Sequence, residues 1–329
     1  MSPILHPRVL AAMAQPAMRL SHLLWHGVRD YWMRLSDAQQ AAFVTQFGSE
    51  WVPARPSRNK RGEVILNNRA GLDFLFMHRH MICQVNCILK QARAKPIVGF
   101  KRPPMKDSEY PVVRDYRLPP EVYASKDDAV WKKIVSVTGD LLTPANLKNI
   151  HPAELGTRIE YGIHAAMHER FGGYSTSGRL RLDQTDILKS PTSTWNLPGY
   201  DTLLDSYAAH VHPGFWKIHG WVDSCLDAWE RENKCQILWD TWMGGMQHGD
   251  CGHDHHPQHK GPKLSTLIEA VDFLTRAGMS SKFTPALYVL NPGMEWPGPT
   301  LKAPKLKMPK LIAKERPGAK PSKSPGHHH

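Results

Sequence analysis

Apolar residues recur every three or four positions over much of the chain up to about residue 280, which predicts amphipathic helices. Helices are expected at 17–34, 36–47, 70–92, 127–138, 144–150, 152–171, 201–210, 213–232 and 265–277. The second of these opens on a capping box formed by Ser36 and Gln39. Strand-like alternation is limited to short runs such as 286–290, and 95–120 and 174–200 show no regular period. The pattern therefore predicts a mainly α fold with long irregular loops.

The composition agrees with a folded domain, because 41% of the residues are hydrophobic and 22% are charged. These fractions exclude collagen-like, wholly disordered and disulfide-stapled classes. Every long apolar stretch is interrupted by a charge or a histidine before about 18 residues, so we expect no membrane span. The five cysteines are an odd number without zinc-ribbon spacing, which favours reduced thiols and a cytoplasmic location.

The chain changes character near residue 297. From there on it holds seven Lys and one Arg against one Glu, with a proline every few residues, and it ends in His327–His329, typical of an expression tag. Proline interrupts helices and like charges repel, so 297–329 is predicted to be a disordered basic tail behind a domain at 1–296. Such a tail suits nucleic acid, anionic lipid or simple solubility. Because 1–296 has no nucleic-acid-binding motif, that function ranks last.

Histidine is unusually frequent, with 19 residues, and several of these lie on faces of predicted helices that should pack. Two pairs have i, i+4 spacing, so that both rings of a pair project from one face. An imidazole buried without a partner costs about 1–3 kcal/mol, so rings on apolar faces need a reason to be there. The rings concerned are His22 with His26, His164 with His168, and the single residues His78 and His219 on two further helices.

Metal coordination supplies such a reason. Three neutral imidazoles suit copper, zinc or iron and leave a position open for another ligand. A zinc peptidase is excluded because neither HLLWH nor HAAMH has a Glu after its first His. A ferritin-like di-iron site is excluded because Glu160 and Glu169 lack the repeated Glu-x-x-His partner. Six imidazoles with few carboxylates and no thiolates favour copper.

Three helices resemble motifs of the type-3 dicopper family of tyrosinases, catechol oxidases and hemocyanins. Its CuA pattern FLPWHRxxL is similar to FLFMHRHMI here, and its CuB patterns HNxxHxxxGG and DPxFWxHHxxxDxxxxxW are similar to IHAAMHERFGG and HPGFWKIHGWVDSCLDAW. The resemblance covers about 17–235. It implies an antiparallel four-helix bundle that holds two copper ions, binds O2, and converts phenols, catechols or aminophenols to o-quinones.

Ligands follow from the resemblance for one copper and partly for the other. It implies His164, His168 and His219 as the CuB ligands and His78 as the last CuA ligand. Nine residues before that last ligand, where tyrosinases carry their middle CuA ligand, this chain has Arg69.

The two remaining CuA ligands are therefore our own inference from the residues. We expect His22 and His26 to supply them, which makes both copper sites an HxxxH pair plus one histidine. His80 or His6 are the alternatives for one of them.

Acidic residues near the ligands are candidates for supporting roles. Asp223, one turn after His219, is expected to hold its helix or a ligand ring, with a plain surface charge as the alternative. Tyrosinases that hydroxylate monophenols often carry Asn after the first CuB histidine, where this chain has Ala165. Glu160 is then the expected catalytic base, with Glu154 as the alternative. Oxidation of catechols or aminophenols does not require the Asn and is still expected. Whether the protein hydroxylates monophenols is left undecided.

A second histidine-rich segment, 248–259, has the Gly, Asp and Pro content of a loop. It either binds soft metals as a copper-loading loop or is an inert surface loop. A lid over the coppers would have to use Tyr288 or Trp296, because the tail beyond has no aromatic residue. The principal expectation is a dicopper phenol or catechol oxidase, and the alternative is a non-catalytic O2-binding or copper-handling protein.

Overall fold

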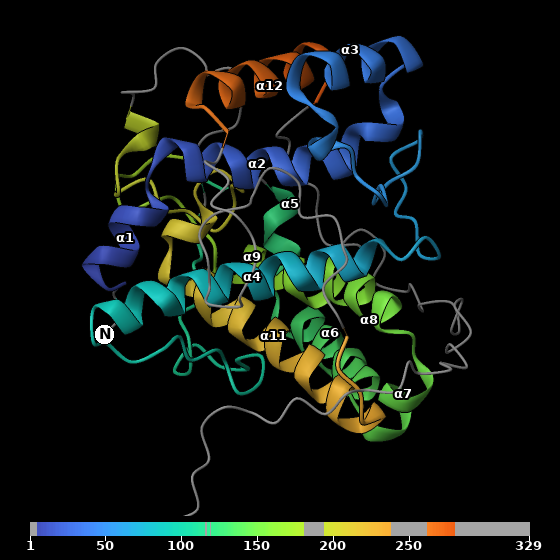
Figure 1. The fold of residues 1–329 in the computed structure, drawn as a ribbon. Coiled ribbons are helices and arrows are strands. Elements are labelled where there is room, and N and C mark those ends of the chain that lie inside the picture. The colour runs from blue at the N-terminus through green and yellow to red at the C-terminus, as the bar shows by residue number, and fades with distance from the viewer. Residues whose placement is uncertain (1–4, 116, 119, 181–193, 238–261, 280–329) are drawn as a thin grey trace, which may run out of the picture.

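A computed structural model describes residues 5–115, 117–118, 120–180, 194–237 and 262–279. These residues are mainly helical, as predicted, and their β pairing is one antiparallel bridge between Arg58 and Val64 (Figure 1). None of the described helices is both long and apolar enough to cross a bilayer. The short run 286–290, the 248–259 loop, the lid candidates Tyr288 and Trp296, and the 297–329 tail lie outside the described residues.

The helices follow the predicted order, with α1 and α5 in addition. Their bounds are α1 Pro7–Met13, α2 Pro16–Tyr31, α3 Asp37–Phe47, α4 Ala70–Gln91, α5 Pro120–Tyr123, α6 Asp128–Leu141, α7 Pro144–Asn149, α8 Pro152–Ile159, α9 Ala165–Phe171, α11 Pro213–Asn233 and α12 Leu264–Arg276. A π-helical turn, η4 (Glu160–His164), joins α8 to α9, and a 3-10 turn, η6 (Ala209–Val211), precedes α11. The predicted capping box of α3 is present.

Three helices open on the same His–Pro pair. Proline occupies the first helical position of α1, α8 and α11, where its missing N–H costs nothing. In each case the histidine before it accepts a hydrogen bond at Nδ1 from the backbone N–H two residues on. The histidines and their distances are His6 (3.3 Å), His151 (3.0 Å) and His212 (2.9 Å). These three rings therefore act as N-caps.

Helix α2 lies between two apolar clusters. Figure 1 shows α3 and α12 on one side of it and α4 on the other. Leu24 and Val28 belong to the cluster with α12, whereas Met18 and Trp25 belong to the cluster with α4 and α11. All four side chains are buried. Contact on two sides carries the middle of α2, with its two histidines, into the interior of the protein.

Helices α4 and α8 approach until their backbones touch. A Cβ atom on Gly71 would lie 2.1 Å from the carbonyl oxygen of Ala153 and 2.2 Å from the nitrogen of Thr157. A Cβ atom on Gly156 would lie 2.2 Å from the carbonyl oxygen of Gly71. Only glycine fits at either position without moving a helix. The contact sets α4, which carries His78, directly beside the segment that leads to His164.

The predicted helix 152–171 is interrupted. The structure divides it into α8, η4 and α9, and Gly162 in the turn has φ −101° and ψ −111°, outside the helical range. Such π-helical turns inside α-helices occur frequently at functional sites. His164 is the last residue of the turn, so the interruption determines where its ring lies relative to that of His168.

The predicted helix 201–210 is wrong, because the chain is irregular as far as residue 208. Local side chains compete with the helical hydrogen bonds there. The carboxylate of Asp205 accepts from the backbone N–H of Tyr207 at 3.0 Å, and Thr202 Oγ1 accepts from the N–H of Leu204 at 3.2 Å. Arg19 of α2 donates to the carbonyl of Tyr200 at 2.9 Å. Part of the hydrogen bonding of this segment is therefore made with a side chain from a distant part of the chain.

Candidate metal centre

The six predicted rings lie together in the interior. Two come from α2, one from α4, two from the η4–α9 segment and one from α11. Neighbouring ring centroids are 4.0–6.1 Å apart: His22–His26 4.9 Å, His26–His78 6.1 Å, His78–His219 4.0 Å, His164–His219 4.9 Å and His164–His168 4.6 Å. Residues up to 197 positions apart in the sequence thus meet at one place.

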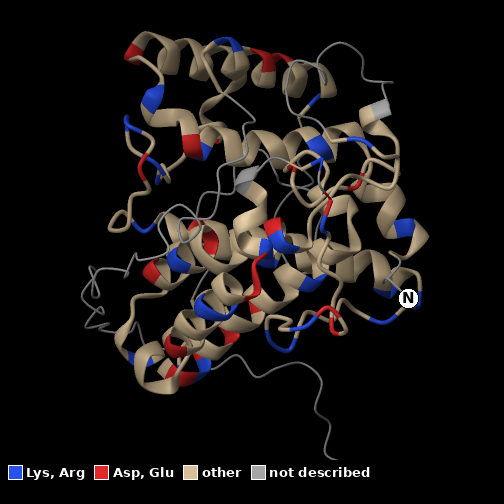
Figure 2. Cartoon of the chain, turned by 180° about the vertical axis from the view of Figure 1, so that it is seen from behind, with Lys and Arg blue, Asp and Glu red and all other residues tan. Residues whose placement is uncertain are grey.

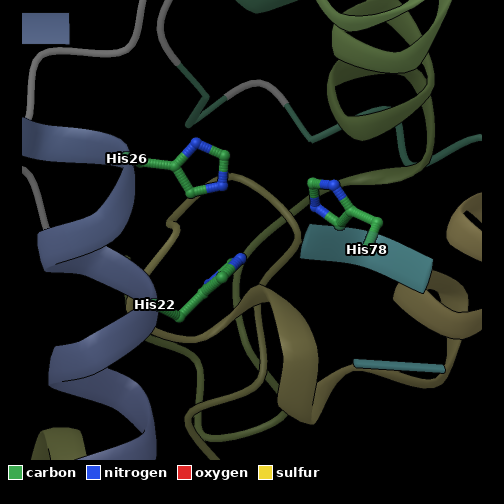
Figure 3. Close-up of side chains that lie close together, drawn as sticks. All are labelled: His22, His26 and His78. Carbon is green, nitrogen blue, oxygen red and sulfur yellow. The ribbon is translucent and has the colours of Figure 1, made fainter. Parts of the chain in front are cut away.

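The first group of rings is His22, His26 and His78, and each offers a ring nitrogen within 4.8 Å of the other two. Figure 3 shows the two rings of α2 facing the ring of α4 across a shared space. His22 and His78 are buried and His26 is partly exposed. The i, i+4 spacing on α2 therefore places both of its rings towards α4, as predicted.

The second group shows the same separation between its ring nitrogens. His78, His164 and His219 offer nitrogens within 4.8 Å of one another, and the ring of His168 lies 5.4 Å from that of His219. One lone pair binds one ion, so His78 serves a single group. His168, the third predicted ligand of the second copper, is not in either nitrogen cluster, but it would complete the second group if His78 is assigned to the first. From here on, the second group means His164, His168 and His219. Each ring is then used once, in two sets of three.

Three of the rings turn back on their own helix. Their Nδ1 atoms lie within hydrogen-bond distance of the backbone carbonyl four residues earlier: His78 to Phe74 at 2.8 Å, His164 to Glu160 at 3.2 Å and His219 to Phe215 at 2.7 Å. A carbonyl oxygen accepts only, so the proton of each neutral ring sits on Nδ1. The lone pair is then on Nε2. We call His78, His164 and His219 the helix-oriented rings.

Two other rings are oriented by the irregular segment 203–206. The Nδ1 of His22 lies 2.5 Å from the carbonyl of Ser206, and that of His168 lies 2.8 Å from the carbonyl of Leu203. The same tautomer follows, with a bare Nε2 on both rings. We call His22 and His168 the loop-oriented rings. Each of the two groups contains one of them.

The bare nitrogens are left without an ordinary partner. The Nε2 atoms of His22, His78 and His168 are buried with no hydrogen-bond partner. Those of His164 and His219 lie 2.9 Å apart, although both protons sit on Nδ1. Two lone pairs at that distance repel each other unless a cation lies between or beside them. Buried polar atoms are normally satisfied, so this donor set fits a metal bound by imidazole nitrogen.

Burial keeps these rings neutral. Desolvation lowers the pKa of His22 and of His168 to about 4 and holds the pKa of His78, His164 and His219 well below the usual value. Neighbouring rings lower it further, because each disfavours a charge on the next. Neutral imidazole is the form that binds metals. The rings are therefore ready to coordinate at neutral pH.

A cavity of about 160 Å³ opens beside the two groups. Its lining includes five of the six rings, with Phe215, Leu203 and Leu204 among the apolar residues and Glu169 as the carboxylic acid. The Phe215 ring packs 3.7 Å from that of His219. Phe74 lies outside this lining and packs against His78, with 4.5 Å between the ring centroids.

The structure puts Glu160 and Glu154 elsewhere than expected. The buried carboxylate of Glu160 accepts two hydrogen bonds from Arg29, at 2.7 and 3.2 Å, and Glu154 pairs with Arg158 at 2.5 Å. Neither residue is in the cavity lining, whereas Glu169 is. The prediction of Glu160 as the base rested on its lying one turn from His164. Its partner Arg29 lies 131 residues away in the sequence, so the sequence pattern does not indicate this ion pair.

Asp223 contacts an arginine instead of a ligand ring. Its carboxylate pairs with Arg79, which also reaches Asp227 at 2.5 Å and Glu230 at 3.2 Å. The Nδ1 of His219 is already occupied by the carbonyl of Phe215. Of the predicted roles for Asp223, the structure therefore favours the one that holds its helix, because Arg79 joins α11 to α4.

The alternative CuA ligands are not in either group. Neither of the two ring groups found among the described residues includes His6 or His80. Two aromatic neighbours of the first group were missed in the sequence. Trp25 packs edge-on against His26 at 4.8 Å, and His210 lies 4.8 Å from His22. His210 has no i, i+4 partner, so sequence spacing does not identify it.

A scan against protein-family models and a search of the curated proteins find no match for this chain. In the view of Figure 2, Lys and Arg are interspersed with Asp and Glu over the described helices. The geometry of the rings and the cavity therefore carries the functional argument.

Proposed function

We propose that this protein is a copper-dependent oxidase that uses O2 to convert catechol-type substrates to o-quinones or o-aminophenol-type substrates to o-quinone imines. The observation that carries the proposal is the contact between the Nε2 atoms of His164 and His219, 2.9 Å apart, on rings whose Nδ1 atoms each face a backbone carbonyl. We infer from those carbonyls that both protons are on Nδ1. Without a metal this contact is repulsive. Three further bare Nε2 atoms lie close by, so the site offers nitrogen ligands and little else. Copper suits such ligands best among the first-row metals.

Two copper ions would be held by three rings each. His22, His26 and His78 would bind one, and the other would be bound by the second group. Copper at such a site supplies the electron-transfer chemistry that amino-acid side chains lack. In the overall reaction two catechols lose two electrons and two protons each, and one O2 is reduced to two waters.

The residues of the cavity would bind and orient the substrate. Its volume suits one substituted aromatic ring. Phe215 lines the cavity and offers an aromatic surface against which that ring would pack. Leu203 and Leu204 exclude water from one side. We assign to Glu169 the task of accepting the proton of the substrate hydroxyl, because it is the carboxylic acid of the lining.

The cytoplasm is the proposed location. None of the four cysteines in the described residues is in a disulfide: Cys83, Cys87, Cys225 and Cys235. Free thiols are the usual state in a reducing compartment. The proposed partners are the phenolic substrate and O2, and the proposal includes no role for nucleic acid.

Copper analysis and oxidation assays test the proposal together. We expect the wild type to bind two copper ions and to form quinone from a catechol under air. His164→Ala and His219→Ala should each bind about one ion fewer and lose more than about 100-fold in activity, because a lost ligand costs more than a lost neighbour of a ligand. The matched control is His151→Asn, which changes a buried histidine that caps α8.

Three outcomes would contradict the proposal. Copper content and activity unchanged in both variants would show that these rings are not ligands. Zinc bound in place of copper would remove the redox chemistry. Two coppers with reversible O2 binding and no quinone would favour the non-catalytic O2-binding alternative.

A further inference from the structure

His210 is a completely buried histidine that the proposed chemistry does not use. It lies in η6, between the segment 203–206 and α11. The indole N–H of Trp216 donates to its backbone carbonyl at 3.0 Å, which fixes the backbone at this point. The ring is placed against α2, where it touches His22. A polar ring in this position needs both of its nitrogens to be satisfied.

Both nitrogens of His210 have a partner. Nε2 lies 3.1 Å from the carbonyl oxygen of Met13, and Nδ1 lies 3.2 Å from the Nδ1 of His22. The carbonyl of Met13 accepts only, so Nε2 of His210 carries its proton and Nδ1 carries the lone pair. That lone pair accepts the Nδ1–H of His22, which also donates to the carbonyl of Ser206 at 2.5 Å. A hydrogen-bonded chain thus runs from α1 through His210 to His22.

This arrangement distinguishes His22 from the other rings of the centre. The rings of His78, His164, His168 and His219 donate at Nδ1 to a backbone carbonyl. The Nδ1–H of His22 is shared between a carbonyl and a second imidazole. Two acceptors, from two directions, restrict rotation of the ring about its χ angles. The Nε2 of His22 is consequently held in one direction.

We propose that His210 is a positioning residue, which holds the ring of His22 so that its Nε2 faces the first copper site. This inference rests on the proposed dicopper function. His210 does not bind the metal itself, because its Nε2 is protonated and its Nδ1 lone pair is engaged with His22. Groups that hold a metal-binding histidine in this way commonly affect metal affinity by about 10–100-fold.

Two variants separate the two ends of the His210 ring. In His210→Asn the side-chain oxygen replaces Nδ1 and keeps an acceptor for His22, whereas the bond to Met13 is lost. In His210→Gln the amide N–H keeps the bond to Met13, and the acceptor for His22 is lost. His210→Phe keeps the ring volume and loses both. His151→Asn, at a buried histidine outside the centre, is the control.

Copper affinity is measured for each protein by competition with a chelator, together with the number of ions bound. We expect one of the two ions to bind about 10–100-fold more weakly in His210→Gln and His210→Phe, with the other unchanged. His210→Asn should stay within a few-fold of wild type. Equal affinity in all variants would overturn the proposal. Loss of both ions from a protein whose circular dichroism is unchanged would also overturn it.

A measurement on the metal-free protein distinguishes failure of this proposal from failure of the proposed function. NMR of ring-labelled histidine reports the Nδ1 proton of His22, which His22→Phe identifies by its absence. We expect slow exchange of this proton with water in the wild type and in His210→Asn, and fast exchange in His210→Gln. Equal exchange in all three would reject the role of His210, whether or not the protein binds copper.

Discussion

The helix-oriented and loop-oriented rings reach the same tautomer by different means. His78, His164 and His219 need only their own helix, because the acceptor lies four residues earlier in the chain. His22 and His168 depend on carbonyls that lie 184 and 35 residues away. The first arrangement forms whenever the helix forms. The second requires the segment 203–206 to be in place, so assembly of the complete centre depends on the tertiary fold.

The segment 203–206 serves both groups of rings. It supplies an acceptor to one member of each group and also lines the cavity. A regular helix would have used these carbonyls for its own hydrogen bonds. The irregular backbone of this segment is therefore what allows it to orient two histidine rings.

The buried pair of Arg29 and Glu160 joins α2 to η4, and so joins the two groups of rings. In Glu160→Gln the guanidinium of Arg29, fully buried, is left without its charge partner. We expect the free energy of unfolding to fall by about 3–5 kcal/mol, measured by urea unfolding. Glu63→Gln removes an exposed pair with Arg61 and should cost less than about 1 kcal/mol. Loss of activity at unchanged stability would instead support Glu160 as a base.

Acid should destabilise the metal-free protein through the loop-oriented rings. Burial lowers the pKa of His22 and His168 to about 4, below the value of about 6.5 for an unfolded histidine. Between these values the unfolded chain binds more protons, so the free energy of unfolding falls as the pH falls. The full effect is roughly 3 kcal/mol per ring. Urea unfolding across this range should show a shallower decline in His22→Phe, and an equal decline would contradict the assignment.

Arg19 holds the segment that carries the loop-oriented acceptors. Its buried guanidinium donates to the carbonyls of Ala14, Leu197 and Tyr200 at 2.9–3.1 Å. Arg19→Gln should cost about 1–3 kcal/mol of unfolding free energy, because buried carbonyls lose their donor. Copper should bind more weakly at both sites, since each has one loop-oriented ligand. Elemental analysis after chelator dialysis checks this, with the exposed Arg8→Gln as control. Weakening at one site only would contradict it.

The capping histidines should behave differently from the ring groups. His212→Ala removes the acceptor for the backbone N–H of Gly214 and should lower the unfolding free energy by about 1 kcal/mol. His212→Asn should restore most of it, because Asn is a good N-cap. Copper content should stay at the wild-type value in both variants. A lost copper ion in His212→Asn would show that this ring takes part in metal binding.

Much of the fold could be predicted because each helix depends mainly on residues that are close in the sequence. Periodicity and caps predicted α4 as 70–92 and α11 as 213–232, and the structure has Ala70–Gln91 and Pro213–Asn233. The same local rule brought the i, i+4 pairs onto one face. It failed at 201–210, where the carboxylate of Asp205 and the guanidinium of Arg19 take backbone groups that a helix would use.

The remainder of the site depends on contacts between distant segments. No spacing relates His210 to His22, or Arg29 to Glu160. Both contacts arise only when α2 is enclosed between its two neighbouring layers. For the same reason the sequence shows Glu169 only as an acid without a Glu-x-x-His partner, whereas the structure places it in the cavity lining.

The touching backbones of α4 and α8 have a consequence for engineering. Gly71 and Gly156 fix the distance between the helix of His78 and the turn of His164, and hence the separation of the two groups of rings. A methyl group at either position would push the two helices apart. Ala substitutions there offer a way to change the gap between the two groups of rings while every histidine stays unchanged.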